Sequence, residues 1–251
     1  MSPTYHDVPS AKENPIARIR QLSKIYGQGS TEVRALDGVD LDIGRGELTA
    51  IMGPSGSGKS TLMHCVVGLE TPTSGTVDIG GRTVTGMKQS ELTAFRRDHI
   101  GFIFQSFNLV PTLTAEENIR LPATIAKRPI DEERFATVVE TVGLANRLTH
   151  RPAELSGGQQ QRVACARAMV GSPDIVLADE PTGNLDSTAT EQILSFIRTS
   201  VDTLGQSVVM VTHEPEAAAW ADRVIFLADG KITGELLSPD RDSVLNVLRG
   251  A

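Results

Sequence analysis

Short runs of apolar residues recur along the 251-residue chain, and polar segments that contain glycine separate them. Runs of this length with almost no polar position are typical of strands buried on both faces of a sheet. Amphipathic stretches lie between several of the runs, for example a helix predicted from about Ser187. Strands that alternate with helices predict an α/β domain with a mostly parallel sheet covered on both faces. The expected strands are residues 48–52, 100–104, 175–178, 208–211 and 224–227.

Residues 16–50 show a different pattern, in which apolar and polar residues alternate and glycines interrupt the alternating stretches. That pattern predicts strands with one buried face, and therefore a separate antiparallel β layer. Residues 76–79, followed by Gly80 and Gly81, are expected to add a strand and a tight turn to this layer.

The segment from about 106 to 158 interrupts the alternation of strands and helices, and Asp131 within it is expected to cap a helix. An inserted helical subdomain is therefore predicted for 106–158, within one domain that spans 15–239. Residues 1–14 contain no apolar core of a signal peptide and are expected to form a loose tail. Residues 240–251 are predicted to form a short C-terminal helix.

Acidic residues outnumber basic ones by 31 to 24, which gives a formal net charge of −7. A broadly acidic chain with 4% aromatic residues is a poor candidate for a nucleic-acid partner. No apolar stretch approaches the roughly 20 residues that span a bilayer. Cys65 and Cys165 lie among small apolar residues, so we expect buried, reduced thiols in a cytosolic setting rather than metal ligands.

One motif identifies the class of ligand. Residues 53–61 match the full phosphate-loop pattern G-x-x-x-x-G-K-[ST] between a predicted strand and a mostly apolar helix. Its glycines let backbone N–H groups turn toward a polyphosphate, Lys59 can reach the β- and γ-phosphates, and the Ser60 hydroxyl can hold Mg²⁺. The residues predicted to bind phosphate are Gly53, Pro54, Ser55, Gly56, Ser57, Gly58, Lys59, Ser60 and Thr61.

Two acidic residues end the strand predicted at 175–178. Asp179 is placed to bind Mg²⁺ directly or through water. Glu180, one residue further, is placed to polarise a water molecule for attack on the γ-phosphate.

A second anion-binding element is predicted at residues 155–162, where Ser156, Gly157 and Gly158 directly precede a helix. The N-terminal end of a helix attracts negative charge, and this one has no lysine of its own.

Two further polar residues follow predicted strands. Gln105 comes at the start of the helical segment, where its amide can contact Mg²⁺ or the attacking water. His213 can hydrogen-bond a γ-phosphate oxygen and hold Glu180 in place. The remaining histidines are interpreted as structural.

These motifs occur together in the nucleotide-binding subunit of ATP-binding cassette (ABC) transporters, which the chain resembles from about residue 16 to 237. Residues 27–36 and 181–186 further resemble the subgroup of macrolide-exporter, lipoprotein-release and cell-division ATPases. The positions that carry the family resemblance are 53–61, Gln105, 155–162, 175–180, 184–186 and His213.

The resemblance implies a P-loop NTPase fold and an ATPase that binds ATP with Mg²⁺ and forms a homodimer around two ATP molecules. It implies that Tyr26 stacks on adenine, although a tyrosine in the core of the β layer is an alternative. Lys59 would bind phosphate, Glu180 would be the catalytic base and His213 the switch histidine. Gln105 would contact Mg²⁺ and its water.

The remaining implied roles concern the metal and the second subunit. Asp179 would join Ser60 and Gln105 at Mg²⁺. Ser156, Gly157 and Gly158 would bind the γ-phosphate of ATP held by a second copy of the chain, with Asp186 at the contact between subunits.

The resemblance also implies integral membrane permease subunits as partners, and so a cytoplasmic location on the inner face of the cell membrane. Phe107, Leu109, Val110 and Leu113 are candidates for a groove that receives a permease helix, or for packing of the helical segment. The alternatives are a force-transmitting ATPase that moves no cargo, a DNA-repair type ATPase, and a regulatory module that binds nucleotide without hydrolysis. The short gap between motifs disfavours the DNA-repair class.

Overall fold

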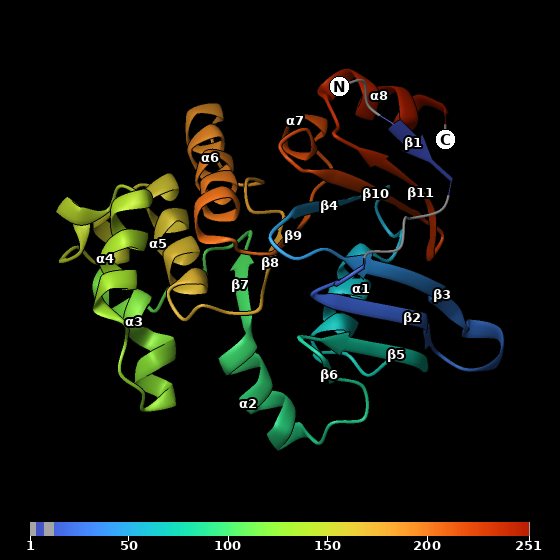
Figure 1. The fold of residues 1–251 in the computed structure, drawn as a ribbon, viewed down its shortest axis with the longest axis horizontal. Helices are drawn as coiled ribbons and strands as arrows, with labels where there is room; N and C mark the ends of the chain where they lie inside the picture. Colours follow the sequence, from blue (N-terminus) through green and yellow to red (C-terminus); the bar gives the residue numbers. More distant parts are fainter. Residues whose placement is uncertain (1–3, 8–12, 251) are drawn as a thin grey trace.

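The computed structural model describes residues 4–7 and 13–250. Its main sheet has seven strands in the order β1-β11-β10-β4-β9-β8-β7, and a second sheet has four strands in the order β3-β2-β5-β6. This arrangement confirms the predicted α/β fold with a mostly parallel sheet and an antiparallel layer. Figure 1 shows the smaller sheet beside the main one, with the helices between residues 115 and 204 on the other side.

The five strands predicted from apolar runs form the parallel centre of the main sheet. Three or more residues of each strand are buried, as expected for strands covered on both faces. They are β4 (Leu48–Met52), β7 (Ile100–Phe104), β8 (Ile175–Asp179), β9 (Val208–Val211) and β10 (Arg223–Ala228). Strand β11 (Lys231–Leu237) joins them antiparallel to β10.

The expectation of a loose tail is wrong for residues 4–6. They form strand β1 (Thr4–His6), which pairs antiparallel with the edge of β11, and the Tyr5 hydroxyl donates to the carbonyl of Thr233 at 3.1 Å. Three residues are too few to show a periodic pattern, and their stabilising partner is an unpaired strand edge far away in the sequence. Residues 1–3 and 8–12 of the predicted tail lie outside the described residues.

The antiparallel layer contains β2 (Ala17–Tyr26), β3 (Val33–Ile43), β5 (Ser74–Ile79) and β6 (Arg82–Thr83). A short 3₁₀ turn, η1 (Gly29–Thr31), joins β2 to β3. Within the predicted 16–50 range, the layer therefore ends at residue 43 with β3, because the last residues of that range belong to β4 of the main sheet.

Several helices begin at a residue whose side chain caps them. Asp131 accepts hydrogen bonds from the N–H groups of Glu133 and Arg134 at the start of α4, as predicted, and Asp186 caps α6 in the same way. The helices are α1 (Lys59–Val66), α2 (Gln89–His99), α3 (Ala115–Ala126), α4 (Glu132–Thr141), α5 (Gly157–Met169), α6 (Ser187–Leu204), α7 (Pro215–Ala218) and α8 (Arg241–Gly250), with 3₁₀ turns η2 (Ala145–Arg147) and η3 (Pro152–Glu154).

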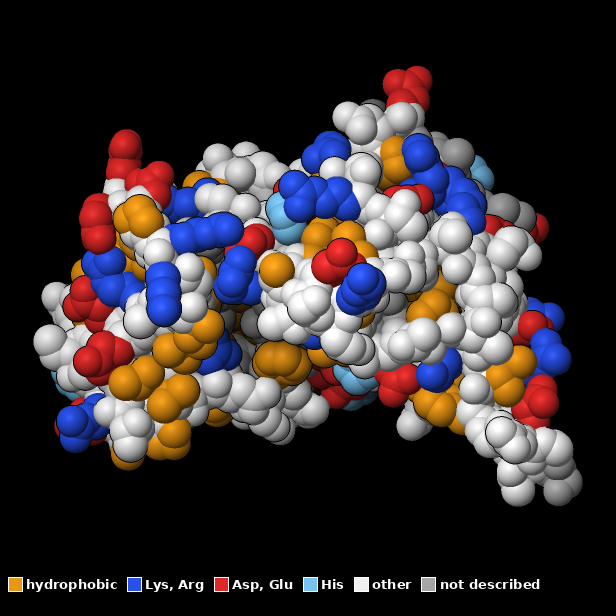
Figure 2. Space-filling view, turned by 90° about the horizontal axis from the view of Figure 1, so that it is seen from below, with side chains coloured by type: hydrophobic (Ala, Val, Ile, Leu, Met, Phe, Trp, Pro, Cys, Tyr) orange, Lys and Arg blue, Asp and Glu red, His pale blue; other side chains and the backbone are white. Residues whose placement is uncertain are grey.

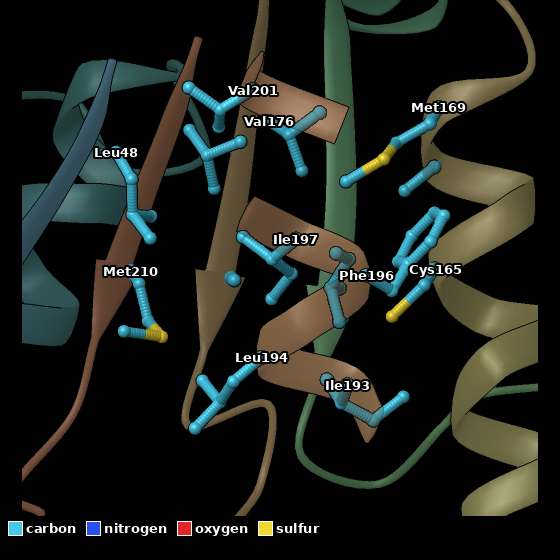
Figure 3. Close-up of a cluster of buried hydrophobic side chains, with 14 of the residues drawn as sticks. Leu48, Cys165, Met169, Val176, Ile193, Leu194, Phe196, Ile197, Val201 and Met210 are labelled. Carbon is cyan, nitrogen blue, oxygen red and sulfur yellow. The ribbon is translucent and has the colours of Figure 1, made fainter. Parts of the chain in front are cut away.

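The helical segment between β7 and β8 lies to one side of the main sheet (Figure 1). Its buried residues Ile119 and Val138 belong to the same hydrophobic cluster as Ile103 of β7. Figure 3 shows how Ile197 of α6 packs between the sheet and the α5 residues Cys165 and Met169. Packing therefore fixes α5 and α6 against the sheet that carries the predicted site.

Within the described residues, no helix combines the length and apolar character needed to cross a membrane. The face shown in Figure 2 carries acidic and basic side chains interspersed, with apolar side chains gathered in small patches.

Candidate active site

The phosphate loop links the end of β4 to the start of α1, where Gly58 stands at the N-cap with φ 103°. A Cβ on Gly58 would overlap the carbonyl oxygen of Ala35, and one on Gly53 would overlap that of Leu227. Only glycine fits at these two positions, because β3 and β10 press directly on the loop backbone. The N-terminus of α1 is thereby held at the carboxyl edge of the main sheet.

The Lys59 ammonium folds back over this loop, donating to the carbonyls of Gly53 at 2.9 Å and Pro54 at 2.8 Å. Burial lowers the pKa of Lys59, while the negative charges of Glu180 and Asp179 act in the opposite direction. The lysine therefore lies within the electrostatic reach of both acids, as a shared phosphate site requires.

Strand register brings the predicted residues to one edge of the sheet. Val211 pairs with Ile51 of β4 on one side and with Asp179 of β8 on the other, so the three strands end level. Phe104, which precedes Gln105, pairs with Asp179. The phosphate loop, the two acids and Gln105 consequently share the carboxyl ends of neighbouring strands, where ligands bind in open α/β sheets.

Glu180 has a left-handed backbone with φ 46°, and its N–H donates to the carbonyl of Val211 at 2.9 Å. Its carboxylate oxygen Oε1 lies 3.0 Å from Nδ1 of His213. A non-glycine residue held at positive φ stores strain, which is common at functional sites. The strained turn directs Glu180 away from the strand and toward the histidine.

Burial raises the pKa of the Asp179 carboxyl, and the charge of Glu180 raises it further. The two neighbouring acids therefore repel each other, and a divalent cation would relieve that repulsion. Among the described residues, no group of three or more His, Cys, Asp or Glu is placed to hold a metal. The carboxylate of Asp179 and the oxygens of Ser60 and Gln105 suit Mg²⁺, with phosphates as further ligands.

Gln105 packs against the turn that follows Glu180. A Cβ on Gly183 would lie 2.6 Å from its amide nitrogen Nε2, and Asn184 Nδ2 donates to its carbonyl at 3.1 Å. The N–H of Gly183 in turn donates to the carbonyl of Glu180 at 3.1 Å. The turn at residues 180–184, which begins at Glu180, thus lies directly against Gln105.

Ser156 caps α5, and its hydroxyl accepts from the N–H of Gln159 at 3.3 Å, while Gln159 Oε1 accepts from the N–H of Ser156 at 2.9 Å. Gly158 packs on α6, where a Cβ would lie 2.8 Å from that of Ala189. A cavity of about 550 Å³ lies over this helix end, lined in part by Ser156, Gly157, Gly158 and Asp186.

The helix end at Ser156 and the phosphate loop are separate sites within the chain. Figure 1 places α5 on the far side of β7 and β8 from α1. One chain therefore offers a lysine-bearing phosphate site and, elsewhere, a lysine-free helix terminus.

Known proteins share this arrangement. A family model described as ABC transporter matches residues 36–183. The macrolide export ATP-binding/permease protein MacB of Hyphomonas neptunium is 44% identical over 223 residues, which cover 88% of this chain and 34% of that protein. The MacB protein of Brucella melitensis is 45% identical over 228 residues, which cover 90% of this chain and 35% of that protein.

A solved dimeric structure of the ATP-binding cassette MJ0796, in a post-hydrolysis state bound to ADP and Pi, has a TM-score of 0.79 and 41% identity. The match covers 89% of this chain and 99% of that one. The chain belongs to the ABC transporter family. Its resemblance to that family is confirmed, and it is an ATP-binding cassette with the ATPase fold. The cassette spans about a third of the length of the MacB relatives.

Tyr26 lies at the end of β2, and 38% of its surface is exposed. The alternative of a core tyrosine is therefore wrong. Lys24 Nζ lies 4.8 Å from the centroid of the Tyr26 ring and pairs with the Glu70 carboxylate at 2.8 Å. The Lys24 ammonium, which Glu70 holds in place, thus covers one face of the Tyr26 ring and limits its movement.

Two residues make contacts at the site that were not predicted. Gln161 is fully buried and donates from Nε2 to the carbonyls of Phe104 and Pro181, and Asn184 holds Gln105 as described above. Gln161 stands inside the predicted 155–162 motif, but only the folded cassette shows what its amide reaches.

The four apolar residues of the predicted groove are half-buried, and Arg167 of α5 donates to the carbonyls of Phe107 and Asn108.

Proposed function

We propose that this cassette hydrolyses ATP between two copies of itself, and that closing and opening of the pair drives a membrane permease. The observation that carries the proposal is the separation of the phosphate loop from the Ser156 helix end within one chain. A γ-phosphate can touch both elements only when two chains face each other. The dimeric MJ0796 cassette bound to ADP and Pi supports this arrangement.

Each predicted residue has a role in that mechanism. Lys59 and the loop N–H groups bind the β- and γ-phosphates of ATP, and Ser60, Gln105 and Asp179 hold Mg²⁺, which would neutralise charge on the phosphates. Glu180 accepts a proton from the attacking water. Its carboxylate is oriented by His213, at the 3.0 Å separation described above.

The second chain completes the site. Its Ser156, Gly157 and Gly158 would present the N-terminus of α5 to the γ-phosphate, where backbone N–H groups and the helix dipole favour negative charge. Hydrolysis removes the charge that bridges the two chains, so the pair opens. ATP thereby biases a two-state assembly.

The partner that receives this motion is proposed to be a membrane permease, which would place the cassette on the inner face of the cell membrane. The relatives named as ATP-binding/permease proteins support such a partner.

The proposed docking surface follows Gln105 closely in the sequence and consists of Phe107, Leu109, Val110 and Leu113. A permease helix bound there could therefore sense the nucleotide through Gln105. Leu109→Asp would then keep basal hydrolysis and lose its response to the permease. An unchanged response would reject that docking surface.

Glu180→Gln tests the central proposal. The variant keeps the hydrogen-bonding shape of the side chain but cannot take a proton, so ATP should bind, phosphate release should stop, and a dimer should accumulate with Mg²⁺ and ATP. Light scattering after gel filtration measures the dimer, and Lys59→Ala is the control that should bind no ATP and remain monomeric. Normal phosphate release by Glu180→Gln, or a monomer saturated with ATP, would overturn the proposal.

A further inference from the structure

Gln161 lies in α5 and is 0% exposed. Its amide nitrogen Nε2 donates to the carbonyl of Phe104 at 3.1 Å and to that of Pro181 at 2.6 Å. Phe104 directly precedes Gln105, and Pro181 directly follows Glu180. A single amide group therefore holds the backbone beside two residues that the proposed function places at the γ-phosphate.

The neighbouring glutamines of α5 bond differently. Gln159 completes the cap at Ser156, and the side chain of Gln160 donates to the carbonyl of Leu155 at 3.1 Å. Both contacts lie within the start of the helix. Gln161 instead reaches Phe104 at the end of β7 and Pro181 in the turn after β8, which lie 57 and 20 residues away in the sequence.

Burial makes these two hydrogen bonds consequential. When a buried carbonyl loses its hydrogen-bond donor, no water molecule can take the donor's place. Either the surrounding backbone shifts, or the carbonyl oxygen is left without a hydrogen bond. The acceptor oxygen Oε1 of Gln161 is buried and accepts no hydrogen bond within the part of the chain that the structure describes. The side chain therefore acts through its N–H groups, which are the ones directed at Phe104 and Pro181.

We infer that Gln161 is a positioning residue that couples the two ATP sites of the dimer. This inference rests on the proposed function, in which the N-terminus of α5 contacts the ATP held by the partner. Engagement of that helix end is passed through the Gln161 amide to Gln105 and Glu180 of the same chain. In each chain this amide thus ties the position of α5 to the backbone beside that chain's own Glu180 and Gln105.

The test compares Gln161→Met, which has similar length and no N–H group, with Gln206→Met as the matched control. Gln206 is also buried and donates from Nε2 to the carbonyl of Pro173 at 3.0 Å, outside the proposed site. The Gln161 variant should bind ATP with an affinity within about twofold of the wild type, because the phosphate loop is unchanged. In a Glu180→Gln background it should still dimerise with ATP. Its kcat for phosphate release should fall about tenfold to a hundredfold, as expected when reacting groups are misplaced by a fraction of an ångström to an ångström. Gln206→Met should keep the wild-type kcat.

A double-mutant cycle separates positioning from general stability. If Gln161 acts through Gln105, Gln161→Met should lower kcat much less in a Gln105→Ala background than in the wild type. An undiminished, multiplicative loss would overturn the inference, as would an unchanged kcat in Gln161→Met alone. If Gln161→Met does not fold, Gln161→Asn keeps an amide that is one methylene too short, and it carries the same expectations.

The outcomes also distinguish this inference from the proposed function. Inactive wild-type protein, or active Glu180→Gln, would contradict the proposed function. If the wild type dimerises and hydrolyses ATP as proposed and the Gln161→Met variant is fully active, only the inference about Gln161 would be contradicted.

Discussion

Oε1 of Glu180 lies 3.0 Å from Nδ1 of His213, although the two residues follow different strands of the main sheet. The side chain of His213 is 62% exposed and that of Glu180 is 27% exposed, so the pair stands at the surface where a substrate can reach it. Nδ1 can donate to the carboxylate while the opposite ring nitrogen stays available for a phosphate oxygen.

Replacement of this histidine should separate binding from chemistry. His213→Ala leaves the phosphate loop intact, so ATP affinity should be close to that of the wild type. The kcat for phosphate release should fall by a factor of roughly 10 to 100, because Glu180 loses the group that orients it. Phosphate release and fluorescent-nucleotide binding measure the two quantities. Equal losses in affinity and kcat would show that His213 serves binding instead.

Asp179 should limit the stability of the nucleotide-free protein. Burial and the charge of Glu180 raise the pKa of Asp179 in the fold above its value of about 3.9 in an unfolded chain. The folded protein therefore holds that proton more tightly, and stability falls as pH rises through the interval between the two pKa values. The whole penalty is present at pH values above the pKa of Asp179 in the folded protein.

Asp179→Asn should consequently raise the thermal midpoint at pH 7 without nucleotide by about 1–3 °C, a range typical of a small stability change in a domain of this size. The gain should vanish at a pH below the unfolded pKa, where Asp179 is protonated in both states. Addition of Mg²⁺ and ATP should stabilise the wild type more than the variant. A variant that is less stable than the wild type at pH 7 would contradict this account.

Tyr26 offers a test that separates recognition of the adenine ring of ATP from binding of its phosphates. Stacking of a base on an aromatic side chain contributes about 1–3 kcal/mol, so Tyr26→Ala should weaken ATP binding by a factor of roughly 5 to 150. Binding of inorganic tripolyphosphate, which has no base, should be unchanged. Tyr26→Trp keeps an aromatic surface and is the matched control. Equal weakening of both ligands by Tyr26→Ala would argue that the tyrosine supports the fold and not the adenine.

The sequence predicts this site to the extent that its residues are near one another in the chain or end strands of one sheet. Residues 53–61 and the acids at 179 and 180 need only local patterns and the rule that parallel strands end at one edge. The strand β1 and the contacts of Gln161 were not predictable, because each depends on a backbone group supplied by a distant element. The exposure of Tyr26 also depends on how β2 ends against its neighbours.

Gly158 and Ala189 provide a packing test of the helix end that is proposed to meet the second ATP. A Cβ on Gly158 would lie 2.8 Å from the Cβ of Ala189, so Gly158→Ala should push α5 away from α6 and cost about 1–3 kcal/mol of stability. In a Glu180→Gln background it should also weaken ATP-driven dimerisation, while ATP binding to the phosphate loop persists. The exchange Gly158→Ala with Ala189→Gly removes the overlap and should restore the thermal midpoint and dimerisation together. If the exchange restores stability but leaves dimerisation weak, the backbone of Gly158 itself must lie against the second nucleotide, with no room there for a methyl group.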